Sequence, residues 1–345
     1  MDAILEELID QFGFAAVSLT TAPRGFVAET YFVDAKAPSS TASTRYFLKV
    51  FRNARLAQNI PYAVGLQAEL ADTLETKSGS PVIPRPVTTT TGHFVFTVRG
   101  AESLGSGLSG RVESTEHTAV LYQHLPGSTT RAFSWERYFG VLCEIYRTSL
   151  DLQQQLLPPL VEHFTLLDER LLQTLESYYL EYTGEDTFHC LVRDYLRPYA
   201  TAIQRHWQHW QRAAERCRGN TGPFYITHGD GPGNVMQNGD ALYIVDWDEL
   251  RWAPLERDTW FHAFDPEQRR LLQTVLCDFG LSGGFRTDFL HYYAAKRFFD
   301  DLLDFLEGIY HADDETTKRN LFDGLVQDCF GWTFPILEDL VANSF

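Results

Sequence analysis

The sequence predicts an α+β fold in two lobes: a small antiparallel sheet with one helix, then a mostly helical lobe that contains a short β-hairpin. Two observations support this prediction. Aromatic and β-branched runs bounded by turn residues dominate the first third of the chain, and amphipathic helical patterns dominate the remainder. A length of 345 residues with 44% hydrophobic content is sufficient for two such lobes. We expect the first lobe over residues 1–121, a hinge at 122–127 and the helical lobe over 128–345.

Four runs in the first lobe have the composition of strands. They are rich in Phe, Tyr, Val and Thr and cover residues 26–33, 46–51, 93–98 and 119–122. Between the second and third of these runs, residues 63–75 repeat apolar side chains at helical spacing, and the prolines that follow end this helix. The first lobe is therefore expected to be one antiparallel sheet with a single helix.

Long amphipathic patterns predict helices in the second lobe, at residues 135–150, 166–182, 189–216 and 285–310. Two short apolar runs, residues 224–227 and 241–245, interrupt these helices and predict a pair of strands with a turn at 238–240. The sequence His-Gly-Asp-Gly-Pro-Gly-Asn follows the first run, and Asp-Trp-Asp follows the second. We expect this hairpin to carry the chemistry of the protein.

The composition argues against several classes of protein. A formal net charge of −17 opposes binding to a nucleic-acid backbone, and an acidic surface instead attracts cationic molecules or Mg²⁺, although it also serves solubility alone. The five cysteines are odd in number and lack zinc-ligand spacing, so we expect neither a disulfide framework nor zinc. The amino terminus carries acids where a signal peptide needs bases, and no apolar run approaches the length of a membrane span. We expect a cytoplasmic protein without nucleic-acid or membrane partners, and the sequence leaves its oligomeric state open.

The hairpin residues suit phosphoryl transfer. In that reaction one carboxylate orients or deprotonates the attacking hydroxyl, while an amide oxygen and a second carboxylate hold Mg²⁺ on the nucleotide triphosphate. Asp230 is the expected base, and Asn234 and Asp246 are the expected metal ligands. The alternative interpretation is that both motifs are ordinary turns rich in Asp and Gly. The order of two motifs after two strands favours the catalytic interpretation.

A single lysine, Lys49, lies within the apolar run at residues 46–51. A cation at this place can reach the α- and β-phosphates of a nucleotide when a helix glutamate orients it, and Glu69 is the candidate in the predicted helix. A lysine on a half-buried strand more often faces solvent. The hairpin motifs favour the phosphate role.

These residues resemble the signature of the aminoglycoside phosphotransferase and choline kinase family, which has the protein-kinase-like fold. The signature is carried by Lys49, His228, Asp230, Asn234 and Asp246. Residues 243–258 and 291–302 are particularly similar to the spectinomycin and hygromycin phosphotransferase branch. The resemblance implies a small-molecule kinase that uses ATP or GTP with Mg²⁺ and phosphorylates a hydroxyl of a cationic, aminoglycoside-like acceptor, and thus a role in antibiotic resistance.

The catalytic loop departs from the family pattern. Family members usually place four residues between the loop Asp and the Asn, whereas only Gly231, Pro232 and Gly233 intervene here. One missing residue shortens the reach of the chain by roughly 3.3–3.6 Å, although glycines permit unusual backbone angles. Two other interpretations therefore stay open beside an aminoglycoside-type kinase. One is a metabolic kinase for choline, a sugar or an amino-alcohol, and the other is a nucleotide-binding protein without catalysis.

The expected nucleotide contacts follow from the resemblance. In place of a glycine-rich loop the first lobe offers Pro-Arg-Gly-Phe at residues 23–26, where backbone amides and Arg24 are candidates for phosphate contact and an ordinary turn is the alternative. The adenine is expected against the hinge, where the candidates are Tyr122, Gln123, His124 and Leu125.

The acceptor is expected to meet acids of the helix at residues 285–310. Asp300 and Asp304 share one face of this helix, and Asp301 resembles a position that lies near the substrate in the spectinomycin branch. Such a stripe would bind the ammonium groups of a cationic acceptor, and the alternative is a solvated helix face. Supporting roles, including bracing of the metal loop, are expected for His228, Asp248, Arg257 and Asp258.

Overall fold

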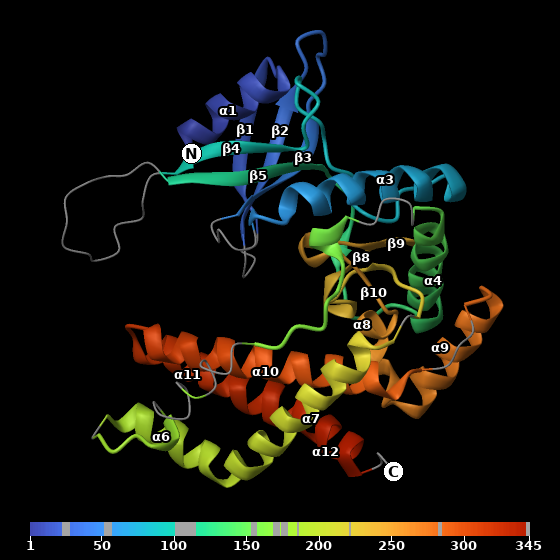
Figure 1. Cartoon of the computed structure of the whole chain (residues 1–345). Helices are drawn as coiled ribbons and strands as arrows, with labels where there is room; N and C mark the ends of the chain where they lie inside the picture. The colour runs from blue at the N-terminus through green and yellow to red at the C-terminus, as the bar shows by residue number, and fades with distance from the viewer. Residues whose placement is uncertain are drawn as a thin grey trace. The chain divides into compact units, whose positions relative to one another are not determined.

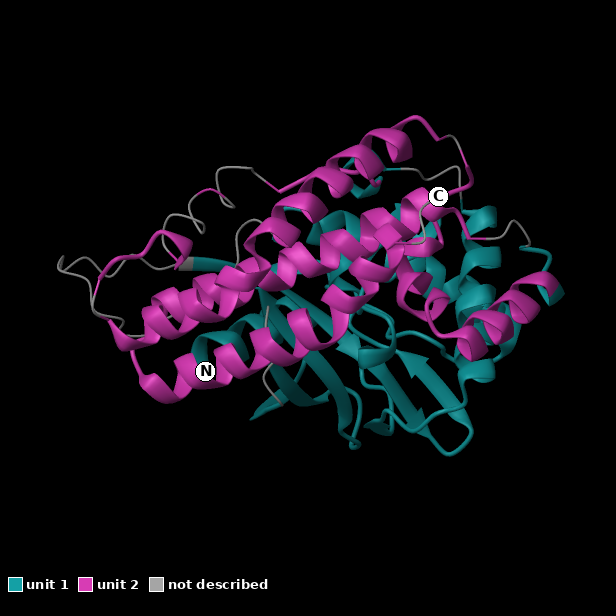
Figure 2. Cartoon of the chain, turned by 90° about the horizontal axis from the view of Figure 1, so that it is seen from below, with its two compact units in different colours: residues 1–161, 225–252, 278–281 teal, residues 162–224, 253–277, 282–345 magenta. Residues whose placement is uncertain are grey.

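The computed structural model describes residues 1–22, 28–51, 57–100, 115–152, 157–167, 173, 179–184, 186–220, 222–281 and 285–342. The chain forms two compact units (Figure 2). The first unit comprises Met1–Val161, Tyr225–Trp252 and Asp278–Leu281, and the second comprises Glu162–Phe224, Ala253–Cys277 and Ser282–Phe345. The segment that carries both polar motifs therefore belongs to the same unit as the amino-terminal strands. The expected hinge at residues 122–127 stays a prediction.

The first unit is built on a five-stranded antiparallel sheet with the strand order β1-β2-β3-β5-β4 (Figure 1). Its strands are β1 (Ala16–Thr21), β2 (Ala28–Lys36), β3 (Thr44–Phe51), β4 (Val95–Gly100) and β5 (Thr115–Gln123). The last four overlap the four predicted runs. The sequence prediction missed β1 because this edge strand has mostly exposed side chains and lacks the apolar alternation by which a strand is identified.

Two helices, α1 and α3, cover opposite faces of this sheet (Figure 1). α1 spans Asp2–Phe12 and α3 spans Ile60–Ser78. Leu8 of α1 shares one buried cluster with Leu48, and Val64 of α3 shares another with Phe51. Because successive side chains of a strand point to opposite faces, Lys49 lies on the face of Phe51, toward α3.

The remainder of the first unit consists of two small sheets and α4 (Trp135–Asp151), which packs against α3, β7 and β9. One sheet has the order β6-β8-β9, and β7 pairs with β10 in the other. The strands are β6 (Ser128–Thr129), β7 (Tyr225–Thr227), β8 (Val235–Asn238), β9 (Ala241–Ile244) and β10 (Arg251–Ala253). The two predicted strands are present as β7 and β9, but β9 forms its hairpin with β8. The short and partly polar β8 has no strand signature in the sequence.

The second unit is helical, and α10 is the central helix, which packs against α7, α11 and α12. Its helices are α6 (Thr187–Leu196), α7 (Ala200–Arg218), α8 (Glu256–Thr259), α9 (Pro266–Asp278), α10 (Thr287–His311), α11 (Glu315–Gly324) and α12 (Phe334–Ala342), with π-helical turns over Leu325–Thr333. Aromatic side chains fill its core, where Trp210 and Phe299 stack with ring centroids 5.2 Å apart. This core explains why the Trp-rich stretch of α7 is amphipathic.

Two predicted helices match α4 and α10, and two differ from the prediction. The helix expected at residues 189–216 is divided into α6 and α7, because Pro198 has no backbone N–H and interrupts the helical hydrogen bonds. The helix expected at residues 166–182 lies largely outside the described residues. Within the described ranges, none of the helices combines the length and the apolarity needed to cross a membrane.

The turn into β6 depends on Gly127. Its φ of +121° is a conformation that other residues rarely adopt, and a Cβ added there would lie 2.4 Å from the carbonyl oxygen of Gln237. Ser128 is the register partner of Gln237. A side chain at residue 127 would therefore strain the backbone and push β6 away from β8.

We expect Gly127→Ala to lower the free energy of unfolding by about 1–3 kcal/mol, because it combines a strained φ with a backbone clash. Gly140→Ala in α4 is the matched control. No atom lies within 4 Å of the Cβ it adds, and alanine favours a helix, so stability should be unchanged or rise by up to about 1 kcal/mol. Denaturant titration of both variants tests this expectation, and equal stabilities of the two variants would contradict it.

Candidate active site

The Asp-Trp-Asp motif forms a tight turn directly after β9. Asp246 has φ +70° and ψ 57°, a left-handed conformation that Asp adopts more readily than most residues and that, in non-glycine residues, clusters at functional sites. Trp247 is buried and donates a hydrogen bond from Nε1 to the carbonyl oxygen of Ile244 at 2.8 Å. The buried indole anchors the turn and holds Asp246 and Asp248 on either side of it.

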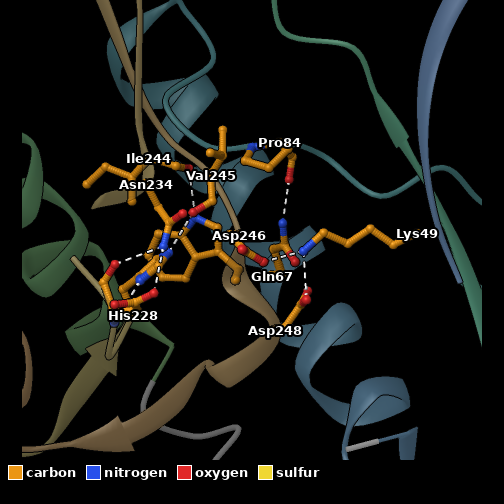
Figure 3. Close-up of polar contacts among 11 residues, drawn as sticks. Lys49, Gln67, Pro84, His228, Asn234, Ile244, Val245, Asp246 and Asp248 are labelled. Carbon is orange, nitrogen blue, oxygen red and sulfur yellow. Dashed lines mark hydrogen bonds and ion pairs between the residues drawn. The ribbon is translucent and has the colours of Figure 1, made fainter. Parts of the chain in front are cut away.

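Lys49 brings these two carboxylates together (Figure 3). Its Nζ donates a hydrogen bond to Oδ1 of Asp246 and another to Oδ2 of Asp248, the second at 2.7 Å. The lysine is 8% exposed, so its charge is held away from solvent. A buried lysine needs such partners, because burial of an unpaired ammonium is costly.

The three charges shift one another's protonation. Burial raises the pKa of Asp248 to about 6, and the charge of Asp246 adds to this shift against the attraction of Lys49. Burial also opposes ionisation of Asp246, but the adjacent Lys49 outweighs it and lowers the pKa of that carboxyl. Burial would lower the pKa of Lys49, yet the two carboxylates raise it. One ammonium beside two carboxylates leaves an excess of negative charge that favours binding of a further cation.

Glu69 is not the partner of Lys49. Its side chain is exposed on the outer face of α3, and the described contacts of the Lys49 ammonium are Asp246 and Asp248. The buried face of α3 instead presents Gln67, which is 1% exposed and donates from Nε2 to the carbonyl oxygen of Pro84 at 2.7 Å (Figure 3). Helical periodicity already contains this signal, because residue 67 lies four positions from Ala63 and three from Leu70, on the apolar face.

The His-Gly-Asp segment follows β7 and is held to β9 by its histidine. His228 is fully buried, and its Nε2 lies 2.7 Å from the carbonyl oxygen of Val245. The backbone N–H of Asp230 donates to Nδ1 of His228 at 3.1 Å, so Nε2 carries the hydrogen that Val245 accepts. The imidazole thus fixes the start of the Asp230 loop next to the residue that precedes Asp246.

The shortened loop still brings Asp230 and Asn234 into contact. Nδ2 of Asn234 donates to the carbonyl oxygen of Asp230 at 2.9 Å and to its Oδ2 at 3.1 Å. Gly229 takes φ +95°, and a 3₁₀ turn over Pro232–Asn234 closes the loop. Glycine conformation and a tight turn therefore accommodate the missing residue.

The oxygens of this region have the chemistry that Mg²⁺ prefers. Val245 donates its N–H to the carbonyl oxygen of Asn234 at 2.9 Å, which places Asn234 across the hairpin from the residue before Asp246. Oδ1 of Asp248 is buried and receives no hydrogen bond from the described residues, so a cation would satisfy it. Among the described residues, no three His, Cys, Asp or Glu side chains form a complete metal site. A Mg²⁺ bound through Asn234 and Asp246 would thus need phosphate or water oxygens as further ligands.

The expected nucleotide residues lie partly within the described structure. Arg24 lies outside it. Tyr122 is buried on the same face of the sheet as Lys49, and burial, followed by the charges of Asp248 and Asp246, raises its pKa. The backbone N–H of Gln123 is bonded to the carbonyl oxygen of Arg85, at 2.9 Å.

Beyond this strand, His124 and Leu125 make no backbone hydrogen bond within the described part of the chain. Their amide and carbonyl groups are thus available to a ligand such as a purine edge.

The expected acceptor residues lie on α10 of the second unit. Lys296 pairs with Asp300, and Nε of Arg297 donates to Asp301 at 2.8 Å. Burial raises the pKa of Asp301 to about 6, although Arg297 favours its ionised form. Burial and then the charge of Asp300 raise the pKa of Asp304. Burial therefore raises the pKa of Asp301 and of Asp304, which distinguishes these two carboxyls from those of a fully solvated helix face.

The expected supporting residues of α8 are buried in the second unit. Arg257 is 6% exposed and Asp258 is 1% exposed. Beside them, Glu256 accepts two hydrogen bonds from the Arg286 guanidinium, at 2.8 and 2.9 Å, and a third from its backbone N–H. Sequence reasoning did not identify this pair, which fixes the start of α10. Bracing of the metal loop by Arg257 and Asp258 stays a prediction.

Solved structures show which fold this is. A spectinomycin phosphotransferase in complex with ADP and spectinomycin matches with a TM-score of 0.60 and 18% identity, over 98% of this chain and 93% of that one. A microcompartment-associated aminopropanol kinase matches with a TM-score of 0.54 and 13% identity, over 95% of each chain. A thermostable mutant of an aminoglycoside phosphotransferase, in ternary complex with ADP and hygromycin B, matches with a TM-score of 0.50 and 13% identity, over 99% of this chain and 98% of that one. The expected kinase-like α+β fold is confirmed.

The sequence itself identifies the family. No curated protein matches the chain at a significant level. The model of the phosphotransferase enzyme family matches residues 18–302, which include both strand-end motifs and Lys49. The expected class of enzyme, a phosphotransferase with an alcohol group as acceptor, is thereby confirmed. The chain belongs to the phosphotransferase enzyme family.

Proposed function

We propose that this enzyme transfers the γ-phosphoryl group of ATP or GTP to a hydroxyl of a small cationic molecule of the aminoglycoside or aminocyclitol type. The observation that carries the proposal is that Asp230, Asn234 and Asp246 lie at adjoining strand ends of one unit, where Lys49 of β3 contacts Asp246. Two of the similar structures hold ADP together with an aminocyclitol or aminoglycoside, which supports this substrate class.

Asp230 suits the role of base. It is exposed, its backbone is fixed by His228, and the amide of Asn234 orients its carboxylate. The acceptor hydroxyl gives its proton to this carboxylate while its oxygen bonds to the γ-phosphorus. The bond from that phosphorus to the bridging oxygen breaks, and ADP leaves with the electron pair.

Asn234, Asp246 and Lys49 suit the nucleotide phosphates. When bound, Mg²⁺ would neutralise the charge that develops on the phosphate oxygens. Asn234 and Asp246 would hold it through an amide and a carboxylate oxygen, and Lys49 would donate to the α- and β-phosphates. The backbone groups of His124 and Leu125, which bond to no other backbone group among the described residues, support adenine binding at the end of β5.

The acids of α10 are the proposed acceptor contacts. Asp300, Asp301 and Asp304 offer carboxylates on α10, and the partial burial of Asp300 and Asp301 strengthens their attraction to an ammonium group. Lys296 pairs with Asp300 and Arg297 pairs with Asp301, so an acceptor has to replace these intrahelical ion pairs.

A kinase for a metabolic amino-alcohol is the second candidate. The similarity to an aminopropanol kinase, at a TM-score of 0.54, favours it. Both candidates share a cationic acceptor with a hydroxyl group, so acidic contacts on α10 serve either. Acceptor-dependent ADP release separates the candidates when spectinomycin, hygromycin B, aminopropanol, choline and simple sugars are compared. Nucleotide binding without phosphoryl transfer to any acceptor would count against both.

Asp230→Ala is expected to lower kcat by at least about 100-fold, because a positioned base contributes roughly 10²–10⁴-fold to proton transfer. Nucleotide affinity should stay within about twofold of the parent, since the proposed phosphate contact is Lys49, which is held by Asp246 and Asp248. Coupled ADP-release kinetics and calorimetric titration with a non-hydrolysable nucleotide measure the two quantities. Turnover equal to that of the parent would remove Asp230 from the role of base.

Asp246→Ala is expected to abolish use of the Mg²⁺ nucleotide, with kcat/KM reduced by about 100-fold or more, because a lost metal ligand removes several kcal/mol of charge stabilisation. The Mg²⁺ dependence of turnover in parent and variant provides the measurement. An unchanged Mg²⁺ requirement and unchanged kcat/KM would show that the metal is held elsewhere.

The KM for a permanently charged acceptor is expected to fall by about three- to tenfold as the pH rises from 5 to 7. Asp301 has its pKa raised to about 6, so it is neutral below that pH and becomes an anion above it. A partly exposed ion pair contributes roughly 1 kcal/mol, which sets the size of the change. Asp301→Asn should remove this dependence, whereas Asp323→Asn on the exposed surface of α11 should keep it. Identical pH profiles of Asp301→Asn and the parent would exclude Asp301 as an acceptor contact.

A further inference from the structure

Lys49 holds Asp246, which is a proposed ligand of the divalent cation, together with Asp248 two residues further on. Its ammonium group contacts one oxygen of each carboxylate. A metal ion bound to the same two carboxylates, even through their other oxygens, would lie close to the ammonium group, and two cations this close repel one another. The lysine and a metal ion cannot therefore both make their best contacts here.

The helix that packs on this face offers no acid to hold Lys49 away. Kinase sites orient such a lysine with a helix glutamate. In α3 the acids are Glu69, Asp72 and Glu75, and all three are exposed. Gln67, beside Lys49 on the buried face, is neutral and engaged with Pro84 (Figure 3). Asp246 and Asp248 are the carboxylates that attract the ammonium group.

A second observation indicates that a further cation belongs at this position. Asp248 has a side-chain exposure of 10%, and its Oδ1 receives no hydrogen bond from the part of the chain that the structure describes. A buried carboxylate oxygen without a donor is costly, and Lys49 reaches only the other oxygen. A metal ion at the turn would satisfy the oxygen that the lysine leaves unsatisfied.

We propose that Lys49 is an internal counter-ion that competes with the divalent metal for Asp246 and Asp248, so that tight metal binding requires nucleotide phosphates to draw the lysine away. The proposal rests on the proposed nucleotide chemistry and adds an order of binding to it. The metal ion binds tightly only together with the nucleotide, because the phosphates are the alternative partners of the ammonium group. Free metal is a weak ligand of the protein alone.

Mn²⁺ binding to the full chain without nucleotide tests the competition. Lys49→Met keeps the length of the side chain and removes its charge, and it should tighten the Kd for Mn²⁺ by about tenfold or more. Lys77→Met is the matched control, because Lys77 pairs with Asp151 and Thr148 and its loss changes the net charge equally. Adding Asp246→Asn to Lys49→Met should restore weak binding, which assigns the gain to this site and not to the acidic surface.

Wild-type protein provides a test that is independent of how well Lys49→Met folds. Amine acylation followed by mass spectrometry reports the reactivity of each lysine. Saturating Mn²⁺ should increase acylation of Lys49 by about threefold or more, because an amine displaced from the two carboxylates loses its hydrogen bonds and becomes accessible to the reagent. Acylation of Lys77 should not change.

Equal Mn²⁺ affinity in Lys49→Met and wild type, with Lys49 acylation unaffected by Mn²⁺, would overturn the competition. That result leaves the proposed function intact if Mg²⁺-ATP still supports phosphorylation of an acceptor. Conversely, tighter Mn²⁺ binding by Lys49→Met in a protein that phosphorylates no acceptor would support the competition and count against the proposed function.

Discussion

The candidate active site depends on the contact between Lys49 and the two carboxylates of the Asp-Trp-Asp turn. Without this ammonium group, Asp246 and Asp248 would repel one another across a turn that already holds Asp246 at a positive φ. The lysine comes from the strand face that also carries Phe51, so the hydrophobic contact between β3 and α3 sets where the charge lies. The packing of β3 against α3 therefore also determines the electrostatics of the turn. Removal of Lys49, or of the carboxylates that it contacts, would leave a buried charge unpaired.

The site combines buried supports with exposed reactive groups. His228 and Trp247 are buried, contact each other with ring centroids 4.8 Å apart, and bond to carbonyl oxygens at the end of β9. Asp230, in contrast, is exposed. Rigid supports limit the entropy that would be lost on reaching a reactive geometry, and exposure leaves room for a substrate hydroxyl. The same supports explain how a loop one residue shorter than the family pattern keeps Asp230 and Asn234 in contact.

In the second unit, buried contacts likewise hold a helix that carries proposed functional side chains. The Glu256 and Arg286 pair is fixed by three hydrogen bonds, and the Arg286 guanidinium lies 4.1 Å from the ring centroid of Phe289. Together these contacts hold the first turn of α10. A helix fixed at its start and packed along its length presents its acids at constant positions, which is a requirement for selecting one acceptor geometry. The partial burial that raises the pKa of Asp301 is a consequence of that packing.

The sequence by itself determined the α+β class, most strands of the first sheet, the helices α4 and α10, and the residues of the two polar motifs. Those features are local, because strand alternation, helical periodicity and strand-end motifs are encoded within short segments. Tertiary structure alone decided that β9 pairs with β8, that Lys49 meets Asp246 and Asp248 in place of Glu69, and that Glu256 binds Arg286. The pairs of Lys49 with Asp246 and Asp248 and of Glu256 with Arg286 join residues distant in the chain, and spacing along the sequence does not contain the distances on which hydrogen bonds and charge pairs depend. The pairing of β8 with β9 is local, but the short and partly polar β8 carries no strand pattern by which it could be recognised.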